Sequence, residues 1–192
     1  MQIRLAYLSF IFLPTLTSVA WAQPTIYIVR HAEKLTMWLD DRELDAFHPL
    51  STEGVMRAQR LAEQFQPNEI AAIFSSRTTR ALHTALPLSH KLKLPVEVAE
   101  ACMDTAAIAD FYKKLAQRFG PEKSVVLVSH SNIVPYLLRK AGLPVSCFQE
   151  MRIKPAAAPN AWLLSEGYDN IWQIKKTSAP LKSCENFTRR TF

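Results

Sequence analysis

A short apolar segment that ends in two basic residues constrains this chain more than any other feature. Residues 25–29 are apolar, alternating and rich in β-branched side chains, which is typical of a buried strand, and Arg30 and His31 follow directly. In open α/β sheets, ligands bind outside the carboxyl ends of the strands. A buried strand that ends in a cation and an imidazole therefore predicts a functional site at that edge of the sheet.

Three more segments are typical of strands, and helical patterns separate them. Residues 70–74 end in Ser75 and Ser76, residues 94–98 contain a proline, and residues 124–129 end in His130. Helices are expected at about 52–65, 78–91, 105–119 and 133–141, the first capped by Ser51 and the third by Asp104. Strands that alternate with helices predict an α/β fold with a largely parallel sheet and helices on both faces.

The remaining segments carry weaker patterns. Residues 35–49 are expected to form a surface loop, and residues 143–160 show little periodicity. Residues 162–164 and 171–174 are apolar and flank a turn-like segment, so we expect them to pair as a closing hairpin. The tail from Thr177 is polar and basic, and no linker marks a second domain.

The N-terminus has the features of a secretory signal peptide. Arg4 precedes an apolar run over residues 5–20, and Ala20-Trp21-Ala22 fits a cleavage site between small residues. Residues 1–22 are thus predicted to be a signal peptide and residues 23–192 a single exported domain, periplasmic or secreted, without stable membrane insertion after cleavage. An uncleaved anchor is the alternative, although the apolar run is short for a membrane span.

Charge and cysteine content narrow the partners and the compartment. The chain has a formal net charge of +6, which suits an anionic substrate. Lysine and arginine are scattered and no nucleic-acid-reading motif occurs, so nucleic acid is not an expected partner. Export permits one disulfide among three cysteines. We favour Cys147 with Cys184, because both lie in the poorly patterned C-terminal third, while Cys102 is left over.

Two arginines and two histidines are expected to meet at one edge of the sheet. The first strand delivers Arg30 and His31, the second is followed by Arg80 one turn into a helix, and the last delivers His130. Guanidinium binds phosphate through paired hydrogen bonds, and phosphoryl transfer depends mostly on positioning and charge neutralisation. A neutral imidazole can attack phosphorus and form a covalent intermediate. This chemistry requires no metal and no cofactor. Taken singly, each of these residues is more often structural, so the joint pattern carries the interpretation.

Four segments in register resemble the histidine phosphatase (phosphoglycerate-mutase-like) superfamily. The segment Val-Arg-His-Ala-Glu-Lys at 29–34 is similar to that family's Arg-His-Gly signature, as in a small exported branch with Arg-His-Ala-Glu-Lys. Residues 50–59, 74–85 and 126–132 resemble its helix-start, Ser-Ser-x-x-x-Arg-Ala and Val-Ser-His-Gly segments. The resemblance covers roughly residues 25–140.

The resemblance implies a three-layer α/β/α sandwich and specific residue roles. His31 would be the phosphorylated nucleophile of an acid phosphatase, and Arg30, Arg80 and His130 would bind the phosphoryl group. Ala32 departs from the family's glycine, and Ser131-Asn132 from a glycine pair, so loops with positive φ are less favoured there.

The proton donor to the leaving group is the least defined role. The family often places a carboxyl just past the third strand, where Glu100 lies, with Asp104 next. Glu33 lies closer to the nucleophile in sequence, but the family does not normally use that position. If the site has no such proton donor, it would favour substrates with good leaving groups or substrates whose phosphoryl group is bonded to nitrogen.

Other functions stay open at this point. A metal-dependent hydrolase could use Glu33 and His48 with the two site histidines, although their spacing fits no familiar metal motif. A non-catalytic protein that binds phosphorylated glycans would keep the pocket without an acid. The expected partner is a phosphorylated small molecule or glycan. A lipopolysaccharide-core sugar phosphate and general phosphate scavenging are both candidates, and the sequence does not predict the oligomeric state.

Overall fold

A computed structural model describes residues 23–36, 42–155, 158, 161–175 and 183–192. The predicted signal peptide, residues 1–22, lies outside the described residues. A six-stranded sheet runs through the centre in the order β3-β2-β4-β1-β7-β8. Its four parallel strands are β1 (Thr25–Arg30), β2 (Ala72–Ser75), β3 (Val96–Val98) and β4 (Ser124–Ser129). β7 (Asn170–Ile174) and β8 (Phe187–Thr191) add two antiparallel strands beyond β1.

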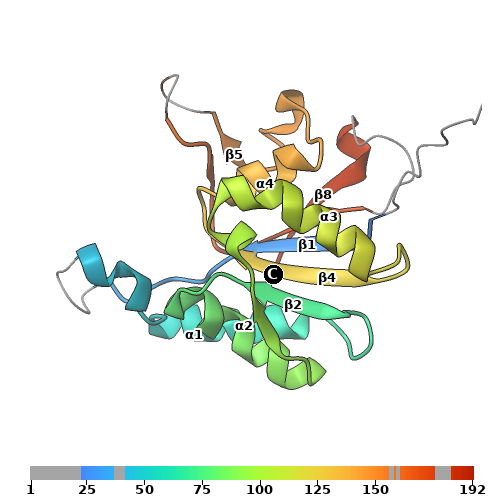
Figure 1. Ribbon diagram of the computed structural model, residues 1–192. Coiled ribbons are helices and arrows are strands. Elements are labelled where there is room, and N and C mark those ends of the chain that lie inside the picture. Colours follow the sequence, from blue (N-terminus) through green and yellow to red (C-terminus); the bar gives the residue numbers. More distant parts are fainter. Residues whose placement is uncertain (1–22, 37–41, 156–157, 159–160, 176–182) are drawn as a thin grey trace, which may run out of the picture.

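Helices cover both faces of the sheet, which confirms the predicted three-layer α/β/α sandwich. α1 (Thr52–Glu63) and α2 (Thr79–Leu92) lie on one face, and α3 (Ile108–Arg118) and α4 (Val134–Lys140) lie on the other (Figure 1). Short 3-10 helices connect these elements: η1 (Arg42–Phe47), η2 (Glu100–Cys102), η3 (Thr105–Ala107), η4 (Val145–Cys147) and η5 (Cys184–Asn186).

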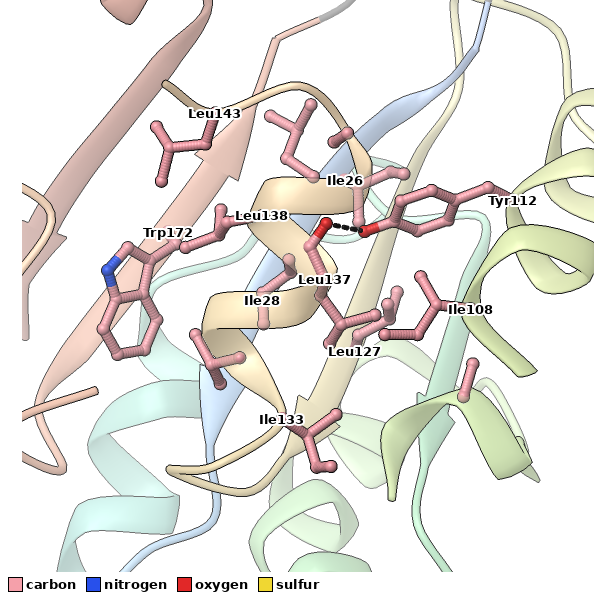
Figure 2. Close-up of a cluster of buried hydrophobic side chains, with 14 of the residues drawn as sticks. Ile26, Ile28, Ile108, Tyr112, Leu127, Ile133, Leu137, Leu138, Leu143 and Trp172 are labelled. Carbon is pink, nitrogen blue, oxygen red and sulfur yellow. Dashed lines mark hydrogen bonds between the residues drawn. The ribbon is translucent and has the colours of Figure 1, made fainter. Parts of the chain in front are cut away.

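The alternating side chains of β1 divide the interior into two cores. Ile26 and Ile28 point into the core beneath α3 and α4, whereas Val29 points into the core beneath α1 and α2. Figure 2 shows the first core, where the buried Tyr112 hydroxyl donates a hydrogen bond to the Leu137 carbonyl oxygen at 2.9 Å. A buried hydroxyl needs such a partner, so this bond helps to fix α3 against α4.

The start of α1 is locked to the loop that follows β1. Ser51 caps the helix as predicted, because its Oγ accepts a hydrogen bond from Gly54 N at 3.2 Å, and its own N–H donates to Glu33 O. A Cβ on Gly54 would lie only 2.2 Å from that same carbonyl oxygen. Glycine at 54 therefore lets the helix approach the loop that begins with His31.

The predicted closing hairpin is wrong. β6 (Leu164–Ser165) pairs with β5 (Ile153–Lys154) in a separate two-stranded sheet, whereas β7 pairs with β1 and β8. Apolar content identified β7 correctly as a strand, but its partners lie far away in the sequence. β8 lies within the segment expected to be only a polar tail; one face of that edge strand is solvated, so its threonines and arginines gave no apolar signal.

Two smaller expectations can also be compared with the structure. The predicted disulfide between Cys147 and Cys184 is confirmed, with the Cα atoms 5.8 Å apart, and Cys102 is a buried free thiol. The segment 35–49, expected to be a loop, contains η1. Within the described ranges, no helix combines the length and the apolar character that crossing a bilayer requires.

Candidate active site

Strand register brings the two predicted histidines together. β1 and β4 are parallel with Arg30 opposite Ser129, so His31 and His130 each occupy the next position along neighbouring strands. The backbone N–H of His31 donates to Ser129 O at 2.8 Å, and the two imidazole rings lie with centroids 5.0 Å apart. β2 ends at the same edge, where Ser76 N donates to Val128 O.

Contacts of His31 define which ring nitrogen is available for reaction. Its Nδ1 lies 2.7 Å from Ala32 O, and because a carbonyl oxygen only accepts, Nδ1 must carry the proton. Nε2 therefore has a lone pair, and Arg80 Nε donates to it at 3.2 Å. Burial, with the nearby His130, Arg80 and Arg30 charges adding to it, lowers the pKa of His31 to about 3. The imidazole is thus neutral at physiological pH.

His130 is held by a serine from the neighbouring strand end. Its Nε2 shares a 2.8 Å hydrogen bond with Ser76 Oγ, which also bonds Thr78 Oγ1 at 3.1 Å. Burial and the positive charge of Arg80 lower the pKa of His130 to about 4. A bound anion would raise the pKa values of both histidines, because an opposite charge favours the protonated form.

Arg30 stacks on an aromatic ring that sequence reasoning did not identify. Its Cζ lies 3.7 Å from the ring centroid of Tyr168, and Nη1 donates to Gly167 O at 3.3 Å. Tyr168 also faces His31, with ring centroids 6.1 Å apart. The Nε of Arg30 is buried and makes no hydrogen bond within the described part of the chain. A buried donor of this kind is ready for an acceptor supplied by a ligand.

Arg80 lies in the first turn of α2, and its side chain is almost fully buried. Besides His31, its guanidinium binds Asp45 in η1, with Nη1 donating to the backbone oxygen at 2.6 Å and Nη2 to Oδ2 at 3.0 Å. Lys34 binds the other oxygen of the Asp45 carboxylate. Thr84, one turn further along α2, accepts from Ala32 N at 2.9 Å and so anchors the loop after His31.

The three predicted acidic residues bind partners other than the site histidines and arginines. Glu100 follows β3 at the same edge of the sheet, but its side chain is 57% exposed and forms a 3.7 Å ion pair with Arg77. Asp104 caps η3, as expected of a capping residue. Glu33 is bound by Arg57 through both carboxylate oxygens.

The four residues of the alternative metal site do not form a shared ligand set. His48 is buried, with Nδ1 2.9 Å from Leu35 O, and the Glu33 carboxylate forms an ion pair with Arg57. Among the residues placed by the structure, no three histidine, cysteine or acidic side chains gather closely enough to hold a metal.

Four side chains of this site were not predicted: Asp45, Ser76 as a histidine partner, Thr84 and Tyr168. Ser76 and Thr84 belong to the segment 74–85 that carried the family resemblance, so the motif was their signal. Asp45 and Tyr168 lie in segments without periodicity. The departures at 32 and 131–132 prove harmless to the backbone, since none of these residues has a positive φ.

Comparisons with known proteins find similarity in sequence and in fold. The sequence profile of the histidine phosphatase superfamily (branch 1) matches residues 26–107. The fold is similar to SixA, a protein histidine phosphatase solved with tungstate, at 20% identity over 86% of this chain and 94% of that chain, with a TM-score of 0.53. A mycobacterial glucosyl-3-phosphoglycerate phosphatase solved with VO3 is 17% identical over 88% of this chain and 97% of its own, with a TM-score of 0.57.

A putative alpha-ribazole-5'-P phosphatase from Escherichia coli is 15% identical, covering 88% of this chain and 96% of that chain, with a TM-score of 0.53. The sequence has no significant match among curated proteins. At these identities the solved structures establish the shared fold, and the profile match supports the superfamily over residues 26–107, less than half of the chain.

Proposed function

We propose that this chain is a phosphoric monoester hydrolase of the histidine phosphatase superfamily, that it is exported, and that it works through a phosphohistidine on His31. The observation that carries this proposal is the hydrogen bond from His31 Nδ1 to Ala32 O. It leaves the lone pair on Nε2 of a neutral, buried imidazole, which is the protonation state that a nitrogen nucleophile needs.

In the proposed first step, His31 Nε2 attacks phosphorus and the bond from phosphorus to the leaving oxygen breaks. Arg30, Arg80 and His130 bind the phosphoryl oxygens and neutralise their charge, which is the main source of catalysis in phosphoryl transfer. The buried Arg30 Nε supports this role, because a phosphoryl oxygen would satisfy it. His130 takes up a proton as the dianion binds and then donates a charge-assisted hydrogen bond.

In the second step, water attacks the phosphohistidine, the bond from phosphorus to nitrogen breaks, and Nε2 regains its lone pair. The leaving oxygen of the first step needs a proton, and Glu100 is the proposed donor, because it follows β3 at the edge where His31 lies. Glu100 regains its proton from the water that attacks in the second step. Glu100→Gln should slow alkyl phosphates and leave p-nitrophenyl phosphate nearly unchanged, since a stable phenolate departs without a proton. Equal rates for wild type and variant on both substrates would remove Glu100 from this role.

Export and substrate class are also proposals. The Cys147–Cys184 disulfide supports an oxidising compartment, and with the predicted signal peptide at residues 1–22 this favours the periplasm or secretion. The substrate is a phosphorylated small molecule or glycan, and the chain is assigned to the small exported branch with Arg-His-Ala-Glu-Lys. The related structures extend the panel to be tested to phosphohistidine, glucosyl-3-phosphoglycerate and α-ribazole phosphate.

A single pair of variants tests the assignment. His31→Ala should abolish hydrolysis of p-nitrophenyl phosphate, while His83→Ala, at an exposed histidine on α2, should keep it. Wild-type turnover by His31→Ala would refute the proposal. Activity that survives a chelator and is inhibited by vanadate excludes the metal-dependent alternative. Phosphate binding without turnover by the wild-type protein would instead support the non-catalytic alternative.

A further inference from the structure

The guanidinium of Arg80 is bound through all three of its nitrogens. Nε donates to His31 Nε2 at 3.2 Å, Nη1 donates to the backbone oxygen of Asp45, and Nη2 donates to the Asp45 carboxylate at 3.0 Å. Asp45 therefore supplies two of the three acceptors that hold this side chain in place.

In this arrangement Arg80 Nε lies against the ring nitrogen that must attack phosphorus. An attacking atom in a productive complex lies about 3–3.5 Å from its target, along the direction of the lone pair. Arg80 Nε lies 3.2 Å from His31 Nε2, within that range of distances. Attack on phosphorus consequently requires the guanidinium to withdraw from Nε2 and to bind the phosphoryl oxygens instead.

Asp45 presents to Arg80 the same kind of group that a phosphate would. A carboxylate and a phosphoryl group both accept paired hydrogen bonds from a guanidinium, so they compete for the same donors. Hydrogen bonding to Lys34, together with the charge of Arg80, lowers the pKa of Asp45, so the competing group is an anion. Its side chain is 44% exposed, which leaves it a route into solvent.

We propose that Asp45 is a positioning residue that holds Arg80 across the nucleophile, and that the phosphoryl group displaces the Asp45 carboxylate from Arg80 when it binds. The inference rests on the proposed function and deepens it, because it assigns a built-in competitor to the phosphate pocket. The apparent affinity of the pocket is then lower than its intrinsic affinity, by the fraction of molecules in which Arg80 is available.

Asp45→Asn tests this proposal, because the amide keeps the shape and removes the charge. Asp110→Asn is the matched control, since Asp110 is an exposed carboxylate on α3 that pairs with Lys114 one turn along the same helix. Inorganic phosphate and vanadate should bind Asp45→Asn about two- to fivefold more tightly, the range expected for a half-exposed ion pair. KM should fall with the phosphate inhibition constant, and kcat should not fall. Weaker or unchanged binding, or a loss of kcat, would overturn the proposal.

Calorimetric titration with inorganic phosphate separates this inference from the proposed function, because it needs no turnover. Tighter phosphate binding by Asp45→Asn without hydrolysis by the wild type would uphold the competition and refute the enzyme mechanism. Hydrolysis by the wild type, with phosphate binding by Asp45→Asn unchanged, would uphold the enzyme mechanism and refute the competition. A second measurement on the wild-type protein follows the ¹³C carboxyl resonance of Asp45. It should shift as phosphate is added, and a resonance that stays fixed while phosphate binds would contradict displacement.

Discussion

The imidazole rings of His31 and His130 meet edge to face, with centroids 5.0 Å apart, at the ends of two adjacent parallel strands. Each is more than nine-tenths buried, and burial lowers the pKa of His31 to about 3 and that of His130 to about 4. Two neutral imidazoles beside two arginines leave the pocket with a positive charge that the Asp45 carboxylate balances only in part, so the pocket favours an anion.

This pair makes stability depend on pH in a defined direction. An unfolded histidine takes up a proton below about pH 6.5, whereas the folded ones resist protonation until about pH 3–4, so the unfolded state binds more protons between these limits. The free energy of unfolding should therefore fall as the pH is lowered from 6.5 towards 4, by about 1.4 kcal/mol per pH unit for each histidine. Urea denaturation at several pH values between 6.5 and 4 measures this change in the free energy of unfolding.

The doubly substituted His31→Asn, His130→Asn protein should lose most of that slope, and His83→Asn should retain it. An unchanged slope in the double variant would mean that other groups control the acid response.

The parts of the site that could be predicted are those fixed by strand register. A parallel sheet places successive strand ends at one edge, so residues directly after β1 and β4 had to lie near one another. Arg80 could be placed because it follows β2 by one helical turn. Local patterns were sufficient for these residues because both the strand and its terminal side chain are encoded in the same short segment.

Asp45 and Tyr168 could not be predicted because tertiary contacts alone place them. Tyr168 lies in the loop between β6 and β7, and that loop is tied to the C-terminal strand, where Phe192 N donates to Asp169 O. That strand is an edge with the sequence Phe-Thr-Arg-Arg-Thr, which carries no apolar alternation of sufficient length. The same long-range pairing explains why the closing hairpin was assigned to the wrong partner.

Arg80 should contribute more to anion binding than any exposed cation. Arg80→Ala should weaken inhibition by vanadate by about 2–5 kcal/mol, the cost typical of removing one member of a buried charge pair. Arg139→Ala, at an exposed position on α4, should leave the inhibition constant unchanged. Equal inhibition of the two variants would place Arg80 outside the phosphate pocket.

Tyr168 should act through Arg30. Tyr168→Leu removes the ring on which the guanidinium lies, and a cation–π contact of about 0.5–2 kcal/mol corresponds to a KM raised roughly two- to thirtyfold. Tyr168→Phe keeps the ring face and should behave like the wild type in steady-state kinetics. If Tyr168→Phe is as impaired as Tyr168→Leu, the hydroxyl rather than the ring face is the functional group.

Gly54 should tolerate no side chain. In Gly54→Ala the new methyl would meet the Glu33 carbonyl oxygen, which cannot move without disturbing the loop after His31, so we expect a loss of about 1–3 kcal/mol in the free energy of unfolding. Gly120→Ala is the control, because the methyl there meets only the flexible end of the Glu122 side chain. Chemical denaturation of both variants measures the difference, and equal stability would contradict the close approach of α1.

The site of phosphorylation tests the central claim most directly. Wild-type protein mixed with a rapidly hydrolysed phosphoester, quenched in alkali and digested, should yield one phosphopeptide containing His31, with phosphorus on Nε2 and not on Nδ1 as judged by ³¹P resonance and mass spectrometry. The assignment to Nε2 follows from the Nδ1 hydrogen bond to Ala32 O. Phosphorus on Nδ1, on another residue, or on no residue during active turnover would contradict this account.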